Sequence, residues 1–373
     1  MTRRLAALLP LLVALAACGS PSPSSTTQPT ATAPVAISPA SPSASASAQP
    51  SDSPSPSPTP LPTGEFAGID GTMADATLSL RTPLAVLIDD NVVARPQAGF
   101  NAAALVYQAP ADGGEDRYML VFQAVDAPTI GPVRSGRPFF VRWAAEYRTG
   151  LAHYGGDYMT LGQTIPALDG KYIYDLDALA GSGAAFHRVG SREAPHNAYT
   201  STEALRSTAA RQGYPATQAT GLGVRPYADD APLASRPTRS SISVPYPRGS
   251  AGYTYDRTAN LYLRSVAGRP HIDAGDGKRV TARNVVVLFM RQSIDPNSEP
   301  GYHRVVLDQV GSGRALLFRE GRVWKATWRK DSVGALTRFF DAGGREIPLV
   351  RGRTFFQVVA TGTKVVYKAD PGA

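Results

Sequence analysis

The 373-residue sequence contains one cysteine and has no apolar run long enough to cross a membrane as a helix. A single cysteine excludes an intramolecular disulfide framework and every zinc or iron–sulfur site that needs several thiolates. The sequence also lacks a Gly-x-Ser-x-Gly nucleophile elbow and the Gly-Lys-Ser/Thr ending of a phosphate-binding loop. No motif therefore identifies a reaction, and the folded state must be stabilised by packing.

One long stretch has almost no charge. Residues 19–64 contain 13 Ser, 12 Pro and 6 Thr, and Asp52 is their only charged residue. Such a composition cannot bury enough apolar surface to offset the entropy of ordering the chain. We therefore expect a disordered linker over residues 18–64, either a spacer or an O-glycosylated or merely unstructured stalk without a positional task.

The N-terminus has the pattern of an exported protein. Two arginines precede the apolar run Leu5–Leu15, whose 11 residues fall short of the roughly 20 that a spanning helix needs. The next residues, Leu15-Ala16-Ala17-Cys18-Gly19, resemble the lipobox of bacterial lipoproteins, in which the cysteine is diacylated on sulfur, for example with palmitate. We predict a lipoprotein signal peptide over residues 1–17 and lipid attachment at Cys18. The alternative is secretory cleavage after an Ala-x-Ala pattern, with a free thiol left nearby.

Charge divides the rest of the chain. Residues 65–213 hold 12 basic and 16 acidic side chains, a net charge of −4, whereas residues 246–373 hold 21 and 11, a net charge of +10. Residues 214–245 are rich in Pro, Ser, Ala and Gly, which is typical of a connector. We predict an α+β protein: a mixed-sheet N-terminal domain and a smaller, basic, mostly antiparallel β C-terminal domain.

Local patterns place the elements of the first half. Short apolar runs bounded by Gly, Pro or Asp predict strands at Leu84–Ile88, Leu105–Tyr107 and Tyr118–Phe122. Helices are expected over Phe139–Tyr147 and Tyr158–Leu168. The clearest helix begins at Thr200, because Thr200-Ser201-Thr202-Glu203 has the capping-box pattern and Gly213 ends the helix.

The second half is predicted to consist mostly of strands. Tyr253–Tyr255 and Leu261–Leu263 flank a turn, and Asn284–Met290 is a buried run. Glu320-Gly321 is a plausible hairpin turn between Ala315–Phe318 and Val323–Trp328. We expect Phe355–Val359 and Val365–Tyr367 to form a last pair.

Several stretches together carry a family resemblance: Leu84–Asp89, Ala94–Gly99, Leu105–Ala109, Gly131–Pro138, Ala194–Thr200, Val310–Gly313, Gly321–Trp324, Trp328–Asp331 and Phe340–Leu349. They resemble the YerB-like bacterial lipoproteins, a family of unknown function with an N-terminal and a C-terminal domain. The resemblance spans about residues 80–366. It implies a lipidated cysteine, a low-complexity spacer, a mixed α+β domain and a β-rich domain, but it makes no residue catalytic.

Four arginines stand out in the acidic half: Arg95, Arg117, Arg134 and Arg137. A guanidinium can bind a carboxylate or phosphate through two parallel hydrogen bonds. The alternative is that each arginine pairs internally with Asp89, Asp90, Glu115 or Asp116. Asp89 and Asp90 follow a buried strand, and because neighbouring strand residues point to opposite faces, only one of them can face a given pocket.

Two histidines lie in loops beside Gly or Pro, His153 and His196. A neutral imidazole can act as base, acid or metal ligand. With His187 they could form a cluster that uses Asp157 as orienting group or ligand. The alternative is that they are structural histidines, since no pair has the helical i, i+4 spacing of strong zinc signatures.

We therefore predict a non-catalytic protein of the bacterial cell membrane, lipid-anchored in the outer leaflet and facing the extracytoplasmic space. It would bind an anionic cell-envelope component in a cleft between its two domains. The candidate ligand-binding residues are Asp89, Arg95, Arg117, Arg134, Arg137, His153, Asp157, His196 and Asn197.

The alternative function is a metal- or acid/base-dependent hydrolase of envelope material that uses His153, His187 and His196; a third is a structural role in an assembly. We predict no cofactor. Expected partners are the membrane, through the lipid, and an anionic cell-wall polymer or envelope protein. For the basic half, phospholipid head groups or the acidic half of the chain itself are further counterparts. Export removes nucleic acid from reach.

Overall fold

The computed structural model describes residues 65–66, 68–218, 225–299 and 301–372. The signal peptide predicted for residues 1–17, the lipid site Cys18 and the linker over residues 18–64 lie outside the described residues. Within the described ranges, helices are too short or too polar to span a bilayer.

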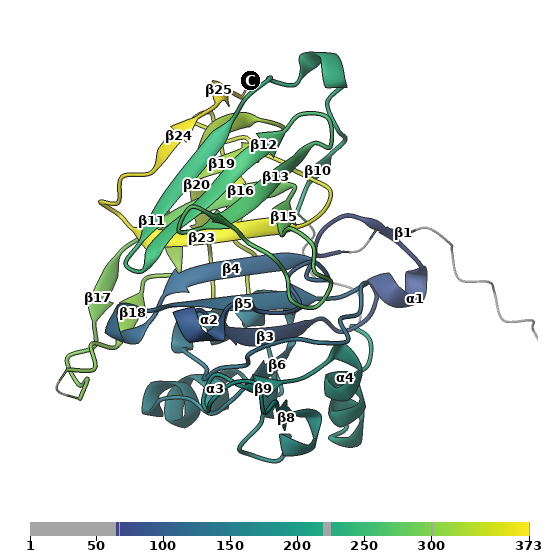
Figure 1. Cartoon of the computed structure of the whole chain (residues 1–373), viewed down its shortest axis with the longest axis vertical. Helices are drawn as coiled ribbons and strands as arrows, with labels where there is room; N and C mark the ends of the chain where they lie inside the picture. The colour runs from purple at the N-terminus through teal and green to yellow at the C-terminus, as the bar shows by residue number, and fades with distance from the viewer. Residues whose placement is uncertain (1–64, 67, 219–224, 300, 373) are drawn as a thin grey trace, which may run out of the picture. The chain divides into compact units, whose positions relative to one another are not determined.

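A sheet of 11 strands forms the centre of the described part (Figure 1). Its strands, in order across the sheet, are β21 (Arg338–Phe340), β20 (Arg322–Lys330), β19 (Gly311–Arg319), β16 (Asn284–Met290), β23 (Thr354–Ala360), β4 (Leu105–Pro110), β5 (Asp116–Phe122), β3 (Leu84–Asp89), β6 (Gly150–His153) and β7 (Tyr174–Asp177), with β25 (Asp370–Pro371) beside β20. Strand β23 pairs in parallel with both β16 and β4. One sheet therefore contains strands from the acidic half and from the basic half.

A second sheet of six strands lies against the first. It consists of β14 (Arg269–Pro270), β13 (Leu261–Val266), β12 (Gly249–Asp256), β11 (Ser241–Tyr246) and β24 (Val366–Lys368), with β15 (Thr281–Ala282) beside β13. Four two-stranded pairs complete the strands of the described ranges: β1 (Glu65–Phe66) with β2 (Met73–Ala74), β8 (His187–Arg188) with β9 (Ala198–Tyr199), β10 (Tyr227–Ala228) with β22 (Leu349–Val350), and β17 (Gln292–Ile294) with β18 (Val305–Leu307).

The helices are short. They are α1 (Ala76–Ser79), α2 (Pro138–Ala144), α3 (Ile165–Leu168) and α4 (Thr202–Arg211), together with the 3-10 or π turns η1 (Val92–Ala94), η2 (Asp112–Gly114), η3 (Ala145–Tyr147), η4 (Thr160–Thr164), η5 (Gly183–Ala185) and η6 (Leu233–Ser235). The protein is thus of the mixed α+β class, with many more strand residues than helix residues.

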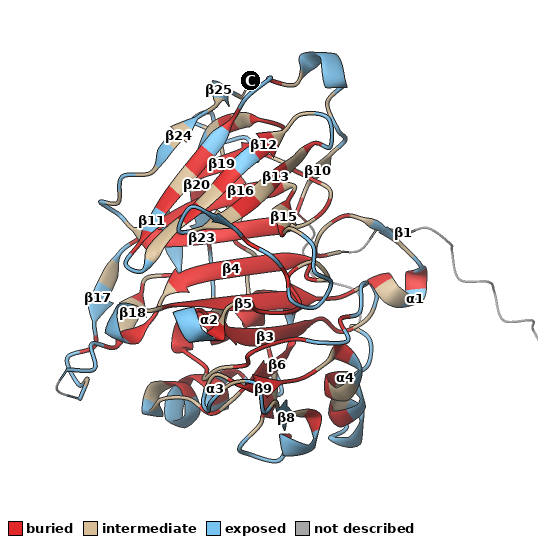
Figure 2. Cartoon of the chain, viewed as in Figure 1, coloured by how far each residue is buried: buried red, intermediate tan, exposed pale blue. Residues whose placement is uncertain are grey.

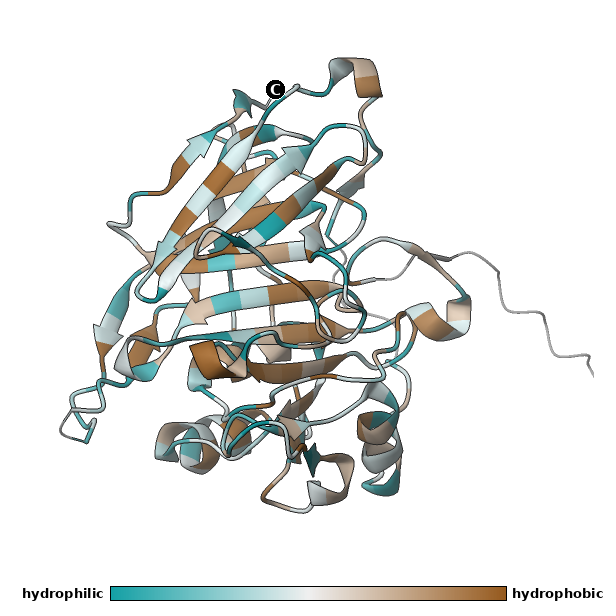
Figure 3. Cartoon of the chain, viewed as in Figure 1, coloured by the Kyte–Doolittle hydropathy of each residue, from teal (hydrophilic) through white to brown (hydrophobic). Residues whose placement is uncertain are grey.

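The central strands are buried on both faces, as the red ribbons of Figure 2 show. In β3, Val86 and Ile88 join one apolar cluster, whereas Ala85 and Leu87 join another on the opposite face. Side chains alternate along a strand, so a strand covered on both sides must be apolar at nearly every position. This is why the central strands are brown for much of their length in Figure 3.

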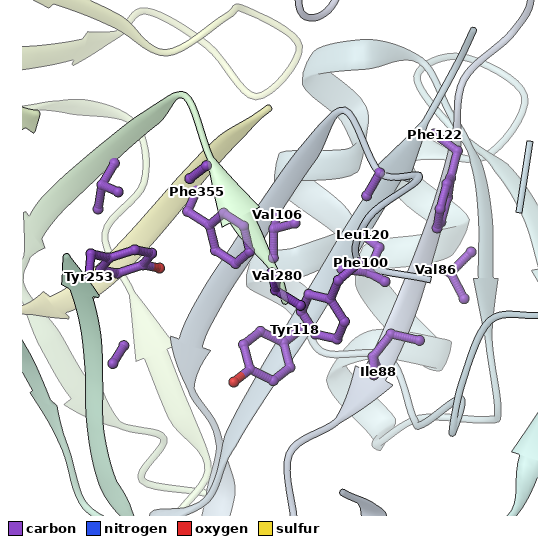
Figure 4. Close-up of a cluster of buried hydrophobic side chains, with 14 of the residues drawn as sticks. Val86, Ile88, Phe100, Val106, Tyr118, Leu120, Phe122, Tyr253, Val280 and Phe355 are labelled. Carbon is purple, nitrogen blue, oxygen red and sulfur yellow. The ribbon is translucent and has the colours of Figure 1, made fainter. Parts of the chain in front are cut away.

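Different layers cover the two faces of the large sheet. The second sheet covers the face that carries Val86 and Ile88. On this face Tyr253 packs edge-on against Phe355 (Figure 4). Helix α4 adds Leu205 to the same cluster. Helix α2 covers the opposite face and buries Phe140 and Trp143. Each face therefore has its own core.

Most of the elements that we predicted are present. The three strands of the first half are β3, β4 and β5, the run Asn284–Met290 is β16, and β12 pairs with β13 as expected. The predicted hairpin is formed by β19 and β20, with Glu320 and Gly321 at φ values of 52° and 75°. The two expected helices correspond to α2 followed by η3 and to η4 followed by α3.

The start of helix α4 differs from the prediction by one residue. Ser201, not Thr200, is the N-cap, and its hydroxyl accepts a hydrogen bond from the Ala204 amide at 3.1 Å. Thr200 is held in an extended bridge with Ile130, and its hydroxyl donates to the carbonyl of Ala185 at 2.7 Å. The shift moves Glu203 out of the position that a capping box requires.

The predicted last strand pair is wrong. Strand β23 lies in the middle of the large sheet, while β24 lies at the edge of the second sheet and pairs with β11. The physical reason is burial: β23 is almost continuously apolar and needs cover on both faces, whereas Val366 and Lys368 of β24 are exposed. The parallel pairing of β23 also makes the second half less purely antiparallel than expected.

Candidate functional site

Polar side chains gather where strand β3 ends, on both faces of the sheet. The register pairs Asp89 of β3 with Arg117 of β5, so these two side chains share the face that α2 covers. Asp90 and Asp116 point to the opposite face, toward the second sheet. The prediction that Asp89 and Asp90 face different surroundings is confirmed, and each face has a separate polar cluster.

The first cluster, called the arginine site below, consists of Asp89, Arg117, Arg134, Arg137 and His196. The Asp89 carboxylate is buried; its Oδ2 lies 2.6 Å from Nδ1 of His196 and 3.2 Å from Nε of Arg134. The side chains of His196 and Arg134 are 18% and 21% exposed. The site is therefore open to solvent on the side of these two residues.

Loops hold Arg134 and His196 against the end of β3. The backbone amide of Arg134 donates to the carbonyl of Leu87 at 2.9 Å, which fixes this loop beside the strand. The loop before His196 is tied by Asn197, whose side-chain amide donates to the carbonyls of Val189 and Arg192. Asn197 therefore positions the loop instead of facing the site.

Arg117 is the arginine of this site that has no carboxylate partner among the described residues. Its Nη1 donates to the carbonyl of Ser135 at 2.9 Å, but its buried Nε has no acceptor, and none of the described carboxylates lies within 4 Å of its guanidinium. Burial, together with the positive charges of Arg137 and Arg134, lowers the pKa of Arg117 to about 9. Arg134, by contrast, is paired with Asp89, whose Oδ2 lies 3.2 Å from the Nε of Arg134.

Arg137 connects the arginine site to the segment between β17 and β18. It forms a buried ion pair with Asp112, and its Nη2 donates to the hydroxyl of Tyr302 at 2.7 Å. Asp157 lies 3.6 Å from Arg137 and 3.3 Å from Arg304. The segment between β17 and β18 therefore borders the arginine site.

The second cluster is buried between the two sheets. Asp90 accepts hydrogen bonds from Arg95 at 2.9 Å and Gln97 at 3.1 Å. Gln108 donates to Asp116 at 3.3 Å and accepts from Arg264 at 2.7 Å. Burial and the neighbouring Asp90 raise the pKa of Asp116 to about 8, and burial also raises the pKa of Asp90.

The structure brings together five of the predicted site residues, which are those of the arginine site. Arg95 belongs to the buried cluster on the other face. The alternative that arginines pair internally holds for Arg95 with Asp90 and for Arg134 with Asp89, and Arg137 also pairs internally, with Asp112, an acid that the prediction did not name. Arg117 has no such partner in the described part of the chain.

The predicted cluster of His153, Asp157, His187 and His196 is not formed. No hydrogen bond or ion pair of the described residues joins any two of them. The reason is that each has its own partner: His153 contacts Asp175 at 2.7 Å, His196 contacts Asp89, and Asp157 contacts two arginines. His187 lies exposed in β8. Within the described ranges, no group of three His, Cys, Asp or Glu side chains is arranged to hold a metal.

Sequence reasoning missed Asp112, Tyr302 and Arg264, which are integral to the two clusters. A signal for Arg264 exists, because alternation in β13 buries Tyr262 and therefore points Arg264 inward as well. No comparable signal exists for Tyr302, which meets Arg137 across 165 residues of sequence.

Comparisons with known proteins agree with this architecture. The chain matches both domains of one family, "Protein of unknown function (DUF3048)": the N-terminal domain over residues 70–215 and the C-terminal domain over residues 242–356. A Bacillus subtilis (strain 168) protein named "Putative lipoprotein YerB" is 29% identical over 300 residues, which are 79% of this chain and 86% of that protein. The crystal structure of YerB protein from Bacillus subtilis is similar with a TM-score of 0.70 and 25% identity, over 81% of this chain and 99% of that one. The chain belongs to the DUF3048 family, as the resemblance in its sequence indicates.

Proposed function

We propose that this chain is a lipid-anchored extracytoplasmic protein that binds an anionic component of the cell envelope at the arginine site. The observation that carries the proposal is Arg117, a buried guanidinium that has no carboxylate within 4 Å among the described residues and whose Nε has no hydrogen-bond acceptor there. A buried donor without a partner costs about 1–3 kcal/mol, so native structures rarely keep one without a reason. An anionic ligand at the partly exposed Arg134 and His196 would add the negative charge that the site lacks.

The charge balance supports an anion over a neutral ligand. Asp89 is shared between Arg134 and His196, and Asp112 is taken by Arg137. The depressed pKa of Arg117 follows from its burial and, beyond that, from the positive charges of Arg137 and Arg134 beside it. Guanidinium groups suit phosphate and carboxylate, because their donors match two acceptor oxygens at once.

Anchoring at Cys18 supports the choice of envelope material. The similarity to a protein named as a lipoprotein agrees with the lipobox pattern in this sequence. A diacylated cysteine would hold the protein on the outer leaflet, where anionic wall polymers and lipid head groups are the abundant anions within reach.

The test is co-sedimentation with purified cell-wall material across a salt series. Arg134→Gln is expected to weaken binding at low salt about tenfold, since a hydrogen bond to a charged group contributes about 1.5–3 kcal/mol. The matched control is Arg269→Gln, which removes an exposed arginine of β14 outside the site. Absence of binding at low salt, or equal losses in the two variants, would contradict the proposal, because screening weakens such contacts only as salt rises.

A second candidate function, acid/base hydrolysis, is favoured by the contact between Asp89 and His196. A buried carboxylate 2.6 Å from Nδ1 can fix the imidazole so that Nε2 is the basic nitrogen. In this reaction Nε2 would accept a proton from the attacking water and pass it to the leaving group. Of the predicted histidines, His196 alone combines a buried acidic partner with a partly exposed ring and a place among arginines.

His196→Gln tests this second function. If the protein hydrolyses peptidoglycan fragments, the substitution is expected to lower kcat by about 10²–10⁴-fold, the usual contribution of a general base. His187→Gln is the control, because His187 is exposed and does not contact Asp89. Unchanged turnover in His196→Gln would remove hydrolysis by this residue while leaving anion binding intact.

A further inference from the structure

A small cavity lies at the opposite end of strand β3 from the arginine site. Its volume is about 170 Å³, and it is enclosed by helix α4, the segment after it, and the first residues of β3 and β6. The wall is mostly apolar and includes Leu84, Ala209 and Tyr214. Gly150 contributes to the space, because a Cβ there would lie 2.9 Å from Leu84.

Two arginines line this cavity beside its apolar wall. Arg81 donates from Nη1 to Asp126 at 3.1 Å and from Nη2 to the carbonyl of Ala124 at 2.9 Å, and Arg206 donates to the carbonyls of Thr82 and Gln123 at 2.9 and 3.2 Å. Among the described residues, the buried Nε of Arg81 has no hydrogen-bond acceptor, and the buried Nε of Arg206 lies 3.8 Å from Asp126. Both cations therefore have one shared carboxylate nearby, whose side chain is 58% exposed.

The electrostatic consequence is a local excess of positive charge. Burial, together with the charge of Arg81, lowers the pKa of Arg206 to about 10. An apolar cavity bordered by a few convergent polar groups is the usual form of a small-molecule site, in which the polar groups orient the ligand. Here the polar groups are two cations that share one carboxylate.

We propose that this cavity binds a small organic carboxylate, with its apolar body against Leu84, Ala209 and Tyr214 and its carboxylate at Arg81 and Arg206. The two guanidinium groups share one carboxylate, Asp126, so the carboxylate of the ligand adds the second negative charge. The volume limits the apolar body to about one aromatic ring or a branched chain of similar size, since an apolar cavity of about 150 Å³ accommodates benzene. The ligand is either a free acid or the C-terminal residue of a peptide with an apolar side chain.

The experiment is a titration of the whole chain, carrying Cys18→Ser so that no detergent is needed, with phenylacetate and with its neutral amide. We expect phenylacetate to bind and the amide to bind at least about tenfold more weakly, because only the acid can use the charged donors. The peptide Gly-Gly-Phe and its C-terminal amide form a second arm. Tighter binding of the peptide than of phenylacetate identifies a peptide C-terminus as the source, and the reverse identifies a free acid.

Two leucine substitutions on helix α4 distinguish binding in the cavity from binding at the surface. Ala209→Leu fills the cavity and is expected to abolish binding of phenylacetate, whereas Ser207→Leu, on the exposed face of α4, leaves it unchanged. Arg81→Gln is a second variant that should weaken the acid but not the amide. Equal binding of acid and amide, no binding of either acid, or equal effects of the two leucines would overturn the proposal. Arg134→Gln in the arginine site should leave this binding unchanged.

Discussion

Replacement of Glu146 by alanine is expected to lower the free energy of unfolding by about 3–5 kcal/mol, the usual cost of breaking a buried ion pair. The Glu146 side chain is fully buried in η3. It lies 2.9 Å from Nζ of Lys330 and accepts hydrogen bonds from the amide and hydroxyl of Thr337 at 3.0 and 2.8 Å. Arg225 approaches it at 3.4 Å. Without Glu146, two buried cations lose their only acidic partner in the described part of the chain.

Urea unfolding monitored by circular dichroism measures this loss. The control is Arg345→Ala, which breaks an exposed pair with Asp341 and should change stability by about 0–1 kcal/mol, as surface ion pairs do. A loss for Glu146→Ala no larger than that of the control would show that the network contributes little. Because Lys330 and Thr337 belong to the second half of the chain, a large loss would also show that this contact couples the two halves.

Asp116→Asn is expected to stabilise the protein at alkaline pH by about 2–5 kcal/mol, since each pKa unit corresponds to about 1.4 kcal/mol. The pKa of Asp116 is about 8 in the folded protein, against an ordinary value of 3.8, because the carboxyl is buried beside Asp90. The folded state therefore keeps a proton that the unfolded state releases. Stability is present in full near pH 4 and is lost as the pH rises toward 8. An asparagine cannot ionise, so this loss disappears.

The measurement is urea unfolding of the two proteins at several values between pH 4 and pH 9. The difference between Asp116→Asn and the unmodified protein should be small at pH 4 and grow until the pH exceeds about 8. Asp331→Asn serves as the control, because Asp331 is exposed and its replacement should give no such trend. A difference that stays constant with pH would mean that Asp116 is ionised in the folded protein throughout this range.

The basic charge of the second half is partly used within the fold. Lys330 pairs with Glu146, Arg304 with Asp157, and Arg248 with Glu115 at 3.3 Å. Each pair joins a cation of the basic half to a carboxylate of the acidic half. The acidic and basic halves therefore neutralise part of each other's charge within the fold. These three cations are not evidence for an external partner.

The residues of the arginine site could be nominated from sequence, but their grouping could not. Arg117 and Arg134 are candidates because guanidinium groups stand out in the acidic half, and His196 is a candidate because it lies in a loop beside Pro. That His196 meets Asp89 across 107 residues depends on how two loops fold against one strand end. For the same reason, the sequence alone groups His153 with His196. In the structure His153 is buried against Asp175 from the neighbouring strand β7.

Local sequence determined the elements that depend on neighbouring residues. The continuous apolar runs of β3 and β16, the alternation of β12 and β13, and the turn at Glu320-Gly321 all follow from side-chain period and backbone preference within a few residues. Tertiary structure alone decided that β23 inserts between β16 and β4 and that Asp89 and Asp90 enter different clusters. Strand order is set by which apolar faces can be buried together, and that depends on contacts between segments up to about 250 residues apart, such as Arg353 with Ala103.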